Sequence, residues 1–322
     1  MKSNVICQKD IAEELGISVN TVSHALRGLS DISEETIQKV RDKAVELGYV
    51  PNSMAIKLKS GSSKTIALIY DNLTNPYFTI MASKLSSLIK KNGYDIIIYP
   101  CQSNYEVDAK LLNDLIASQV DGVLSFLDFD EKIVDTKAFK SIPVVLVGRL
   151  SKYNITSVYS DDFNGGVLIG NYLKKSGCKN VLFIAPAHIE ASSRRYKGLC
   201  SIYPNSKSLY FTEGEDEGRV IDEIKKSNID AVFAFNDSIA CMINREIKRQ
   251  QLNIKIVGFD SIYSELPFFY ELTSVKHDFD KLVDASVNEL FNRIRLNKES
   301  FNYETKRIMI PVALHIKEEN DL

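Results

Sequence analysis

DIAEELGISVNTVSHAL, residues 10–26, is the stretch that decides how the N-terminal part of the chain folds. Apolar residues recur in it at spacings of three and four on both sides of the tripeptide Gly16-Ile17-Ser18. This is the spacing of amphipathic helices. Glycine commonly ends a helix in a left-handed conformation, and serine is a preferred N-cap. The stretch therefore predicts a helix-turn-helix, whose second helix can enter a DNA major groove.

A helical hairpin inside a larger core is the alternative interpretation of the same spacing. The predicted second helix presents a face that a core would not need. Val19, Asn20 and Thr21 share this face with Ser23 and His24. The stretch also lies at the N-terminus, so a DNA-reading module is favoured over a buried hairpin.

The residues that follow predict the rest of a small helical domain over residues 1–50. Ser33 can cap a third helix, which begins with acidic residues and ends at Gly48. Pro51 then breaks the pattern, and Asn52 can cap a helix of about two turns before a polar Ser-Gly-Ser-Ser linker. So short a helix is unstable alone, so residues 51–63 are expected to fold only against a partner.

The composition bounds the class of protein. The chain has 322 residues, 44% of them hydrophobic and 25% charged, which is ordinary for a globular protein of two or three domains. No apolar run approaches the ~20 residues that span a bilayer, and no secretory signal is evident. The five cysteines are scattered without a CxxC pair, as expected in a reducing cytoplasm.

The charge of the N-terminal part gives little sign of DNA binding. The whole chain carries a net charge of −2, and the first 64 residues hold nine Lys or Arg against eight Asp or Glu. Contacts to phosphates must then come from positioned donors and helix N-termini rather than from a general basic field. Strong non-specific binding by a monomer is therefore not expected.

From residue 64 onward the pattern changes to apolar strands that alternate with amphipathic helices. The strands lack polar alternation, which is typical of parallel sheets that are buried on both faces. The expected strands are residues 66–70, 94–99, 121–126, 142–147, 180–185, 231–235 and 254–259. The pattern predicts an α/β body with two doubly wound parallel sheets, and a ligand at the carboxyl ends of their strands.

The loops at those carboxyl ends suit a binding site better than a catalytic one. They carry Asp, Asn and Arg, which can bind vicinal hydroxyls, and aromatic rings, which can pack on the apolar face of a sugar or base. The four histidines lack metal spacing, and no GxSxG, phosphate loop or GxGxxG motif is present. We expect no enzyme activity, metal or cofactor. Asp161-Asp162 is interpreted as loop capping or ligand binding rather than as a metal or acid–base pair.

The chain resembles the lactose repressor/galactose repressor (LacI/GalR) family of bacterial regulators over nearly its whole length. The resemblance rests on an ordered series of motifs. They are DIAEELGISVNTVSHALRG, ISEETIQKVRDKAVELGYVPNSMAIKLKSGSSKTIALI, NPYF, VDGVL, DDFNGG, RRYKGL, FNDSIA, and IVGFD followed by LTSVKHDF. A lone helix-turn-helix would be a weak signal, but this series is specific.

The resemblance implies a cytoplasmic homodimer that binds a near-palindromic operator in double-stranded DNA. Each domain of residues 1–50 would read one half-site in the major groove. The 51–63 segments would pair as hinge helices in the minor groove, where Leu58 is the apolar wedge with Ala55 beside it. The DNA-binding positions carried over are Ser18, Val19, Asn20, Thr21, Ser23, His24, Arg27, Ser33, Asn52, Ala55 and Leu58.

The resemblance also implies an effector-binding and dimerisation body over residues 64–322, similar to periplasmic sugar-binding proteins. Its N-subdomain would cover residues 64–160 and 278–312, and its C-subdomain residues 161–277 and 313–322. The effector contacts carried over by motif are Tyr77, Phe78, Arg195, Asn236 and Asp260, with Asp71, Arg149 and Asp161 as further candidates. Asn236 could instead only cap the next helix, and Arg195 could be a surface charge.

Departures from the family pattern leave several points open. His24 stands where the family usually has Arg, and Arg27 where it usually has Asn, so the operator preference is expected to be unusual. The 196–210 segment is short, which puts the local geometry there in doubt, and the 317–322 tail is too short for a tetramerising helix.

The effector and its effect stay open as well. A neutral sugar fits best, while a nucleobase or a sugar phosphate is open because of Arg149 and Arg194. The sign of the effector's action is also open. The alternative function is a sugar sensor that acts through protein partners.

Overall fold

The computed structural model describes residues 6–50, 62–72, 74–101, 106–187, 189–211, 217–297 and 304–317. The chain divides into two compact units, Met1–Ser63 and Lys64–Leu322. The predicted hinge helix, with Asn52, Ala55 and Leu58, lies outside the described residues. No helix in the described ranges has the length and apolar character needed to cross a membrane.

The first unit is a three-helix domain, built from α1 (Gln8–Leu15), α2 (Val19–Arg27) and α3 (Glu34–Glu46). Gly16 adopts the left-handed conformation after α1, with φ 63°, and the Ser18 hydroxyl accepts a hydrogen bond from the Thr21 amide at the start of α2. Ser33 caps α3 in the same way. Apolar residues of all three helices form one core, and the predicted helix-turn-helix is confirmed.

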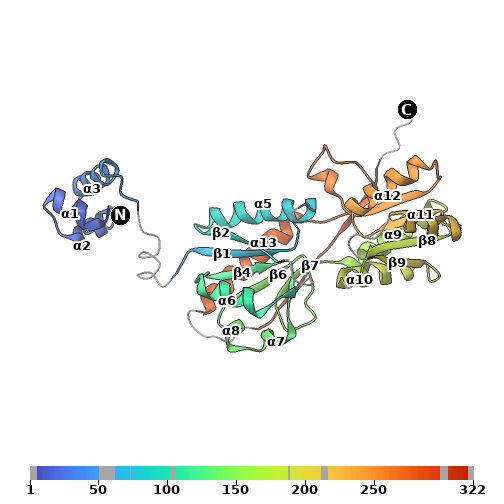
Figure 1. Cartoon of the computed structure of the whole chain (residues 1–322), viewed down its shortest axis with the longest axis horizontal. Coiled ribbons are helices and arrows are strands. Elements are labelled where there is room, and N and C mark those ends of the chain that lie inside the picture. Colours follow the sequence, from blue (N-terminus) through green and yellow to red (C-terminus); the bar gives the residue numbers. More distant parts are fainter. Residues whose placement is uncertain are drawn as a thin grey trace. The chain divides into compact units, whose positions relative to one another are not determined.

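Two six-stranded sheets form the second unit (Figure 1). The first has the strand order β13-β7-β6-β4-β1-β2, and every neighbouring pair in it is parallel. Its strands are β1 (Thr65–Tyr70), β2 (Asp95–Pro100), β4 (Gly122–Ser125), β6 (Val144–Val147), β7 (Ser157–Ser160) and β13 (Arg307–Ile310). Its helices are α5 (Pro76–Lys91), α6 (Ala109–Ala117), α7 (Glu131–Val134), α8 (Lys137–Lys140) and α13 (Phe279–Asn297). A small pair, β3 (Glu106–Val107) and β5 (Asp128–Phe129), lies beside it.

The second sheet has the order β14-β12-β11-β10-β8-β9. It is parallel except for the edge strand β14, which runs antiparallel to β12. Its strands are β8 (Val181–Pro186), β9 (Lys207–Phe211), β10 (Ala231–Ala234), β11 (Lys255–Asp260), β12 (Ser274–Lys276) and β14 (Ala313–His315). The elements around them are α9 (Asp162–Lys175), α10 (Glu190–Cys200), α11 (Glu217–Lys226), α12 (Asp237–Arg249) and the short 3-10 helix η1 (Ile262–Ser264).

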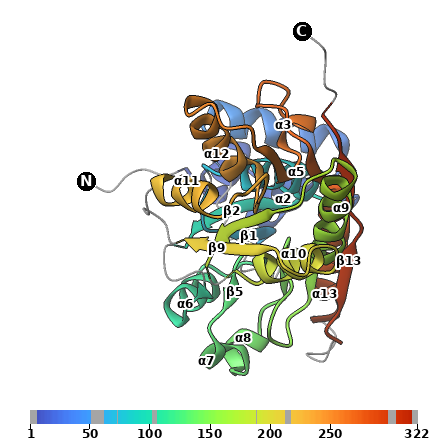
Figure 2. The same ribbon diagram turned by 90° about the vertical axis from the view of Figure 1, so that its right-hand side faces the viewer.

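Helices cover both faces of the second sheet, as the apolar strands predicted (Figure 2). Residues of α9 and α10 pack on one face, and residues of α11 and α12 pack on the other. The α/β architecture with two doubly wound sheets is therefore confirmed. The short strands β7, β9, β12, β13 and β14 were not among the expected strands.

The order of strands explains why a cleft forms where it does. In the first sheet β1 is followed on one side by β2 and on the other by β4, and in the second sheet β8 is flanked in the same way by β9 and β10. The strand order therefore reverses direction at β1 and at β8. Where it reverses, the loops on the two sides run in opposite directions and leave a crevice at the carboxyl ends of the strands. The chain passes between the sheets after β7, after β12 and after β13.

A direct backbone contact joins α9 to α10. A Cβ atom on Gly198 would lie 2.0 Å from the carbonyl oxygen of Phe163, and one on Gly166 would lie 2.1 Å from the carbonyl oxygen of Arg195. Both obstacles are backbone atoms, so they cannot rotate away as a side chain could. Only glycine at both positions allows the two helices to approach this closely.

A Gly198→Ala substitution is therefore expected to destabilise the second unit by roughly 3 kcal/mol through overpacking. Urea unfolding should show a lower midpoint with an unchanged slope. Gly177→Ala is the matched control, because a Cβ there meets no atom within 4 Å and only its φ of 80° is unfavourable. If Gly198→Ala loses no more stability than Gly177→Ala, the close contact between α9 and α10 does not set the cost.

Candidate functional site

The exposed face of α2 is the candidate nucleic-acid interface. Val19 is 45% exposed although it is apolar, and Asn20 beside it is also exposed, while Val22 and Ala25 are buried in the three-helix core. The Ser18 hydroxyl lies 2.9 Å from that of Thr21, and the Arg27 Nε donates to the Ser23 carbonyl at 3.0 Å. The N-terminus of α2 thus presents short polar and apolar groups at a positive helix end, which suits base edges and phosphates.

His24 does not project from α2 as an isolated side chain. Its Nδ1 lies 2.6 Å from the Asp31 carboxylate in the loop before α3. The carboxylate accepts from Nδ1, so the ring is held in one orientation and only Nε2 is left for another partner. The residue that departs from the family pattern is therefore fixed by a second residue, Asp31, which the sequence interpretation did not include.

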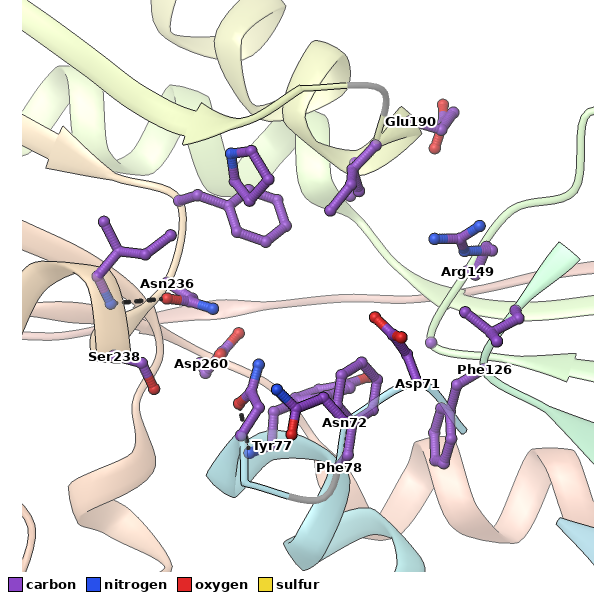
Figure 3. Close-up of a pocket in the computed structure, with 18 of the residues that line it drawn as sticks. Asp71, Asn72, Tyr77, Phe78, Phe126, Arg149, Glu190, Asn236, Ser238 and Asp260 are labelled. Atoms are coloured by element: carbon purple, nitrogen blue, oxygen red, sulfur yellow. Dashed lines mark hydrogen bonds between the residues drawn. The ribbon is translucent and has the colours of Figure 1, made fainter. Parts of the chain in front are cut away.

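The second unit contains a cavity of about 440 Å³ between the carboxyl ends of its two sheets (Figure 3). One wall comes from the loops after β1, β4 and β6 and from the start of α5. The other comes from the loops after β8, β10 and β11 and from the starts of α9, α10 and α12. Of the expected ligand-binding residues, the lining contains Asp71, Tyr77, Phe78, Arg149, Arg195, Asn236 and Asp260.

Three aromatic rings form an apolar side of this cavity. Tyr77 and Phe78, which open α5, contact Phe126 after β4 with ring centroids 5.2 to 6.4 Å apart. Gly148 makes room for the Tyr77 ring, because a Cβ there would lie 2.2 Å from the Tyr77 hydroxyl oxygen. Such rings suit the apolar face of a sugar or of a planar heterocycle.

Arg195 is the buried cation of the cavity, with only 5% of its surface exposed. Its Nε donates to the Asp162 carboxylate at 2.8 Å, and its Nη1 donates to the Phe235 carbonyl. The guanidinium also lies 3.5 Å from the centroid of the Phe259 ring. Arg195 is thus held in one position by an ion pair, a backbone carbonyl and a ring, so it is not the surface charge of the alternative interpretation.

Asp260 ends β11 at the same end of the cavity. Burial raises its pKa from 3.8 to about 7, although nearby Arg195 lowers it. Asp237 next to it also has a pKa raised to about 7 by burial and by Asp260, while hydrogen bonds from Ser274 and Ile262 lower it. Asp260 has a φ of 104°, a conformation that non-glycine residues rarely adopt, and such strain is concentrated at functional sites.

Charged groups of opposite sign occupy the other end of the cavity. Figure 3 shows Asp71, Arg149 and Glu190 there, away from Asn236, Ser238 and Asp260. Burial is the largest influence on Arg149, and it lowers its pKa. Burial likewise raises the pKa of Glu190. Within the described part of the chain Arg149 forms no ion pair, so its guanidinium can bind acceptor atoms of a ligand.

Two of the expected ligand-binding residues cap helices. Asp161 is a correction: it lies outside the lining, because its carboxylate caps α9 by accepting from the Asn164 amide at 3.0 Å. Its neighbour Asp162 faces the cavity instead. Asn236 lines the cavity and also caps α12, since its Oδ1 accepts from the Ile239 amide at 2.9 Å. Its carboxamide nitrogen is the part left for a ligand.

Other lining residues were not among the expected ones. Asn72, Glu190 and Ser238 line the cavity, and His277 lies behind Asp260. Glu190 opens α10 and Ser238 lies in the first turn of α12, each shortly after a strand that was expected to end at the ligand, so their position after a strand was the available signal. Among the described residues no group of three or more His, Cys, Asp or Glu is placed to hold a metal ion.

Comparison with known proteins matches both units. Residues 8–52 match the family model for bacterial regulatory proteins of the lacI family, and residues 63–293 match that for periplasmic binding proteins and the sugar binding domain of the LacI family. The chain is 29% identical over 302 residues to the sucrose operon repressor of Streptococcus mutans, covering 88% of this chain and 92% of that protein.

Two further similarities extend along the chain. The HTH-type transcriptional repressor PurR of Pasteurella multocida is 28% identical over 309 residues, which cover 90% of this chain and 92% of that one. The crystal structure of the lac repressor dimer bound to operator and the anti-inducer ONPF superimposes with a TM-score of 0.81 at 20% identity. That alignment covers 97% of this chain and 98% of the other.

Proposed function

The chain belongs to the LacI family of bacterial regulatory proteins, and from this premise we propose a dimeric transcriptional repressor. Its first unit binds operator DNA, and the cavity of its second unit binds a small sugar that changes operator affinity. The observation that carries the proposal is the presence in one chain of an exposed α2 reading face and a ligand-sized cavity between two sheets. No part of the proposal requires a catalytic step.

The cavity supports a neutral or nearly neutral polyhydroxyl ligand. Its aromatic side can pack on the apolar face of a sugar ring, while Arg195, Asp260 and Asn236 can bind hydroxyl groups. The three carboxyl groups of Asp71, Asp162 and Glu190 outnumber the two guanidinium groups of Arg149 and Arg195, which disfavours a ligand of high negative charge.

The edge of the first sheet supports self-association. The edge strand β2 carries Ile97 and Ile98, which are 40% and 43% exposed. An unpaired apolar edge of this kind favours association with another chain, and a homodimer of this family places two reading faces on one operator. Sedimentation velocity tests the dimer directly.

A thermal-shift screen identifies the effector. Sucrose, cellobiose, ribose, sugar phosphates, purines and nucleosides would be compared, because a ligand present at 100 times its Kd stabilises the folded state by about 2.7 kcal/mol. Thermodynamic linkage then gives the functional test: operator DNA must change effector affinity by the same factor by which effector changes operator affinity. Equal effector affinity with and without operator would exclude the regulatory switch.

An Asn20→Ala substitution is expected to weaken operator binding at each half-site by roughly 1–3 kcal/mol and to relax the preference for one base pair. Asn20 is exposed, and its amide is of the kind that reads a base edge in the major groove. The measurement is a fluorescence anisotropy titration of DNA from the promoter of its own gene.

Gln38→Ala is the matched control for that experiment. Gln38 is also an exposed amide of the first unit, but it lies on α3 and donates to Asp42 at 2.8 Å. The control variant should bind operator like the wild type. If Asn20→Ala also binds normally, the assignment of α2 as the reading helix is wrong, and the sensor that acts through protein partners becomes the better explanation.

A further inference from the structure

A chain of hydrogen bonds leads from the cavity to two of the three connections between the sheets. The Asp260 Oδ1 lies 3.1 Å from the His277 Nε2, and the His277 Nδ1 lies 2.7 Å from the Ser160 hydroxyl. Ser160 is the last residue of β7, just before the first connection, and His277 directly follows β12 at the second. A residue that faces the ligand is thus joined through one imidazole to both connections.

The imidazole of His277 is enclosed on all sides. It is 3% exposed, and the rings of Tyr77, Phe259 and Phe279 have their centroids 5.1 to 5.5 Å from its own. The charged groups that face the pair are Arg195 from α10, Asp162 from α9 and Asp237 from α12, with the Tyr77 hydroxyl from α5. Burial and Arg195 both lower the pKa of His277, to about 3, so the ring is neutral.

A neutral imidazole has one donor nitrogen and one acceptor nitrogen. When Asp260 is ionised it can only accept, so Nε2 must carry the hydrogen and Nδ1 must accept from the Ser160 hydroxyl. When Asp260 is protonated its hydroxyl donates to Nε2, so the hydrogen must lie on Nδ1, which then donates to Ser160. The protonation state of Asp260 therefore dictates the tautomer of His277 and the direction of the bond to Ser160.

We propose that His277 is a positioning residue for effector binding, whose change of tautomer couples the protonation of Asp260 to the connections between the two sheets. When Asp260 becomes protonated, the Nε2 proton moves to its carboxyl group and one further proton binds at Nδ1. The pair of side chains therefore takes up one proton in all. The ring stays neutral in both states. This inference rests on the proposed function only in that Asp260 faces the effector.

The coupling has a consequence for which ligand groups are selected. An effector hydroxyl that donates to Asp260 binds more strongly to the ionised carboxylate than to the neutral carboxyl, so its binding favours the Nε2–H tautomer and the release of a proton. A ligand group that can only accept must compete with Nε2 for the single hydrogen of the protonated carboxyl, so binding of such a group is disfavoured in the Nδ1–H state. A change of tautomer reverses the direction of the hydrogen bond between Nδ1 and the Ser160 hydroxyl at the first connection.

Histidine-selective ¹⁵N labelling of the full-length protein tests the proposal without any effector. The chain has four histidines, and the spectrum of His277→Gln identifies the signals of His277 by their loss. Long-range ¹H–¹⁵N spectra distinguish the two neutral tautomers from the imidazolium. We expect a change from the Nδ1–H to the Nε2–H tautomer as the pH rises, over roughly pH 6 to 8, since burial places the Asp260 pKa at about 7.

Two variants test whether Asp260, and not Ser160, causes the change of the His277 tautomer. Asp260→Asn removes the titrating group but keeps a side chain of the same shape, so the His277 tautomer should no longer depend on pH. Ser160→Ala removes the other partner and leaves Asp260, so the tautomer should still change. A ring that becomes imidazolium in this pH range, or a tautomer that stays constant in the wild type, would overturn the proposal.

Failure of this test and failure of the proposed function can be told apart. Operator binding and the thermal-shift screen do not depend on the tautomer of His277. Once an effector is known, calorimetry in buffers of different ionisation enthalpy measures the proton released on binding. A constant tautomer beside a normal effector response would refute only the coupling.

Discussion

Replacing Arg195 with alanine is expected to abolish the effector response while operator binding persists. Arg195 is 5% exposed and forms an ion pair with Asp162, which is also 5% exposed. Its loss removes a charged hydrogen-bond donor from the cavity and leaves Asp162 as an uncompensated buried charge. We expect effector affinity to fall by about 100-fold, which corresponds to the loss of a hydrogen bond to a charged group together with local rearrangement.

The same substitution should also lower stability. Removing one partner of a buried ion pair costs roughly 3–5 kcal/mol, because the remaining charge is no longer compensated. Urea unfolding measures this loss. Arg194→Ala is the matched control from the adjacent position, since the Arg194 Nε has no hydrogen-bond partner and lies 3.8 Å from Glu190. The control should lose less than about 1 kcal/mol.

A second variant keeps the prediction testable if Arg195→Ala does not fold. In Arg195→Met with Asp162→Asn, both charges are removed and no buried ion remains, which largely restores stability in comparable cases. Effector affinity should still be lost. An effector response of normal size in this folded double variant would show that Arg195 has only a structural role.

Asp260→Asn is expected to stabilise the protein at alkaline pH. The folded-state pKa of Asp260 is raised by burial from 3.8 to about 7. Between these values the folded chain holds a proton that the unfolded chain releases, so unfolding is favoured as the pH rises. The contribution of Asp260 to stability is thus lost between about pH 4 and pH 7, and asparagine avoids this loss. The difference at pH 8 is on the order of 4 kcal/mol.

Asp237 and His277, which are buried near Asp260, also affect how the stability of the wild type depends on pH. Burial also raises the pKa of Asp237, so its effect has the same sign. His277 acts oppositely: its pKa is lowered to about 3, and stability therefore rises as the pH increases from 3 to 6.5. For this reason the measurement is the difference in unfolding free energy between Asp260→Asn and the wild type, taken at pH 4.5 and pH 8.

Asp135→Asn is the control for this pH series, because the Asp135 side chain is 96% exposed. Its difference from the wild type should be small at both pH values. A gain for Asp260→Asn that is as large at pH 4.5 as at pH 8 would mean that hydrogen bonding, and not protonation, distinguishes aspartate from asparagine at this position.

The sequence predicts the first unit well because its signals are local. Gly16 and Ser18 specify the turn between α1 and α2, and Ser33 specifies the start of α3, through interactions within three or four residues. The long strands of the second unit were also predictable, since their uninterrupted apolar residues are buried on both faces except in the edge strand β2. The short strands β7 and β13 were not, because they pair with each other across 150 residues of sequence.

The candidate cavity was predictable as a set of loops but not as a set of contacts. Arg195 lies in the cavity as expected, but its ion pair with Asp162 was not predicted, and the motif comparison gave the neighbouring Asp161 as a candidate effector contact. A shift of one residue in the start of the helix decides which of two adjacent aspartates caps it. His277 could not be assigned at all, since its partners Ser160 and Asp260 lie 117 and 17 residues away.

The glycine contact between α9 and α10 sets a limit for engineering this protein into a biosensor. A side chain at Gly166 or Gly198 would push α9 and α10 apart. Because α9 carries Asp162 and α10 carries Arg195, such a shift would also disturb their ion pair. A combinatorial library for a new analyte is therefore best confined to lining positions outside both helices, such as Arg149 and Ser238. Clones that vary either glycine will be removed by misfolding before selection can act on their ligand preference.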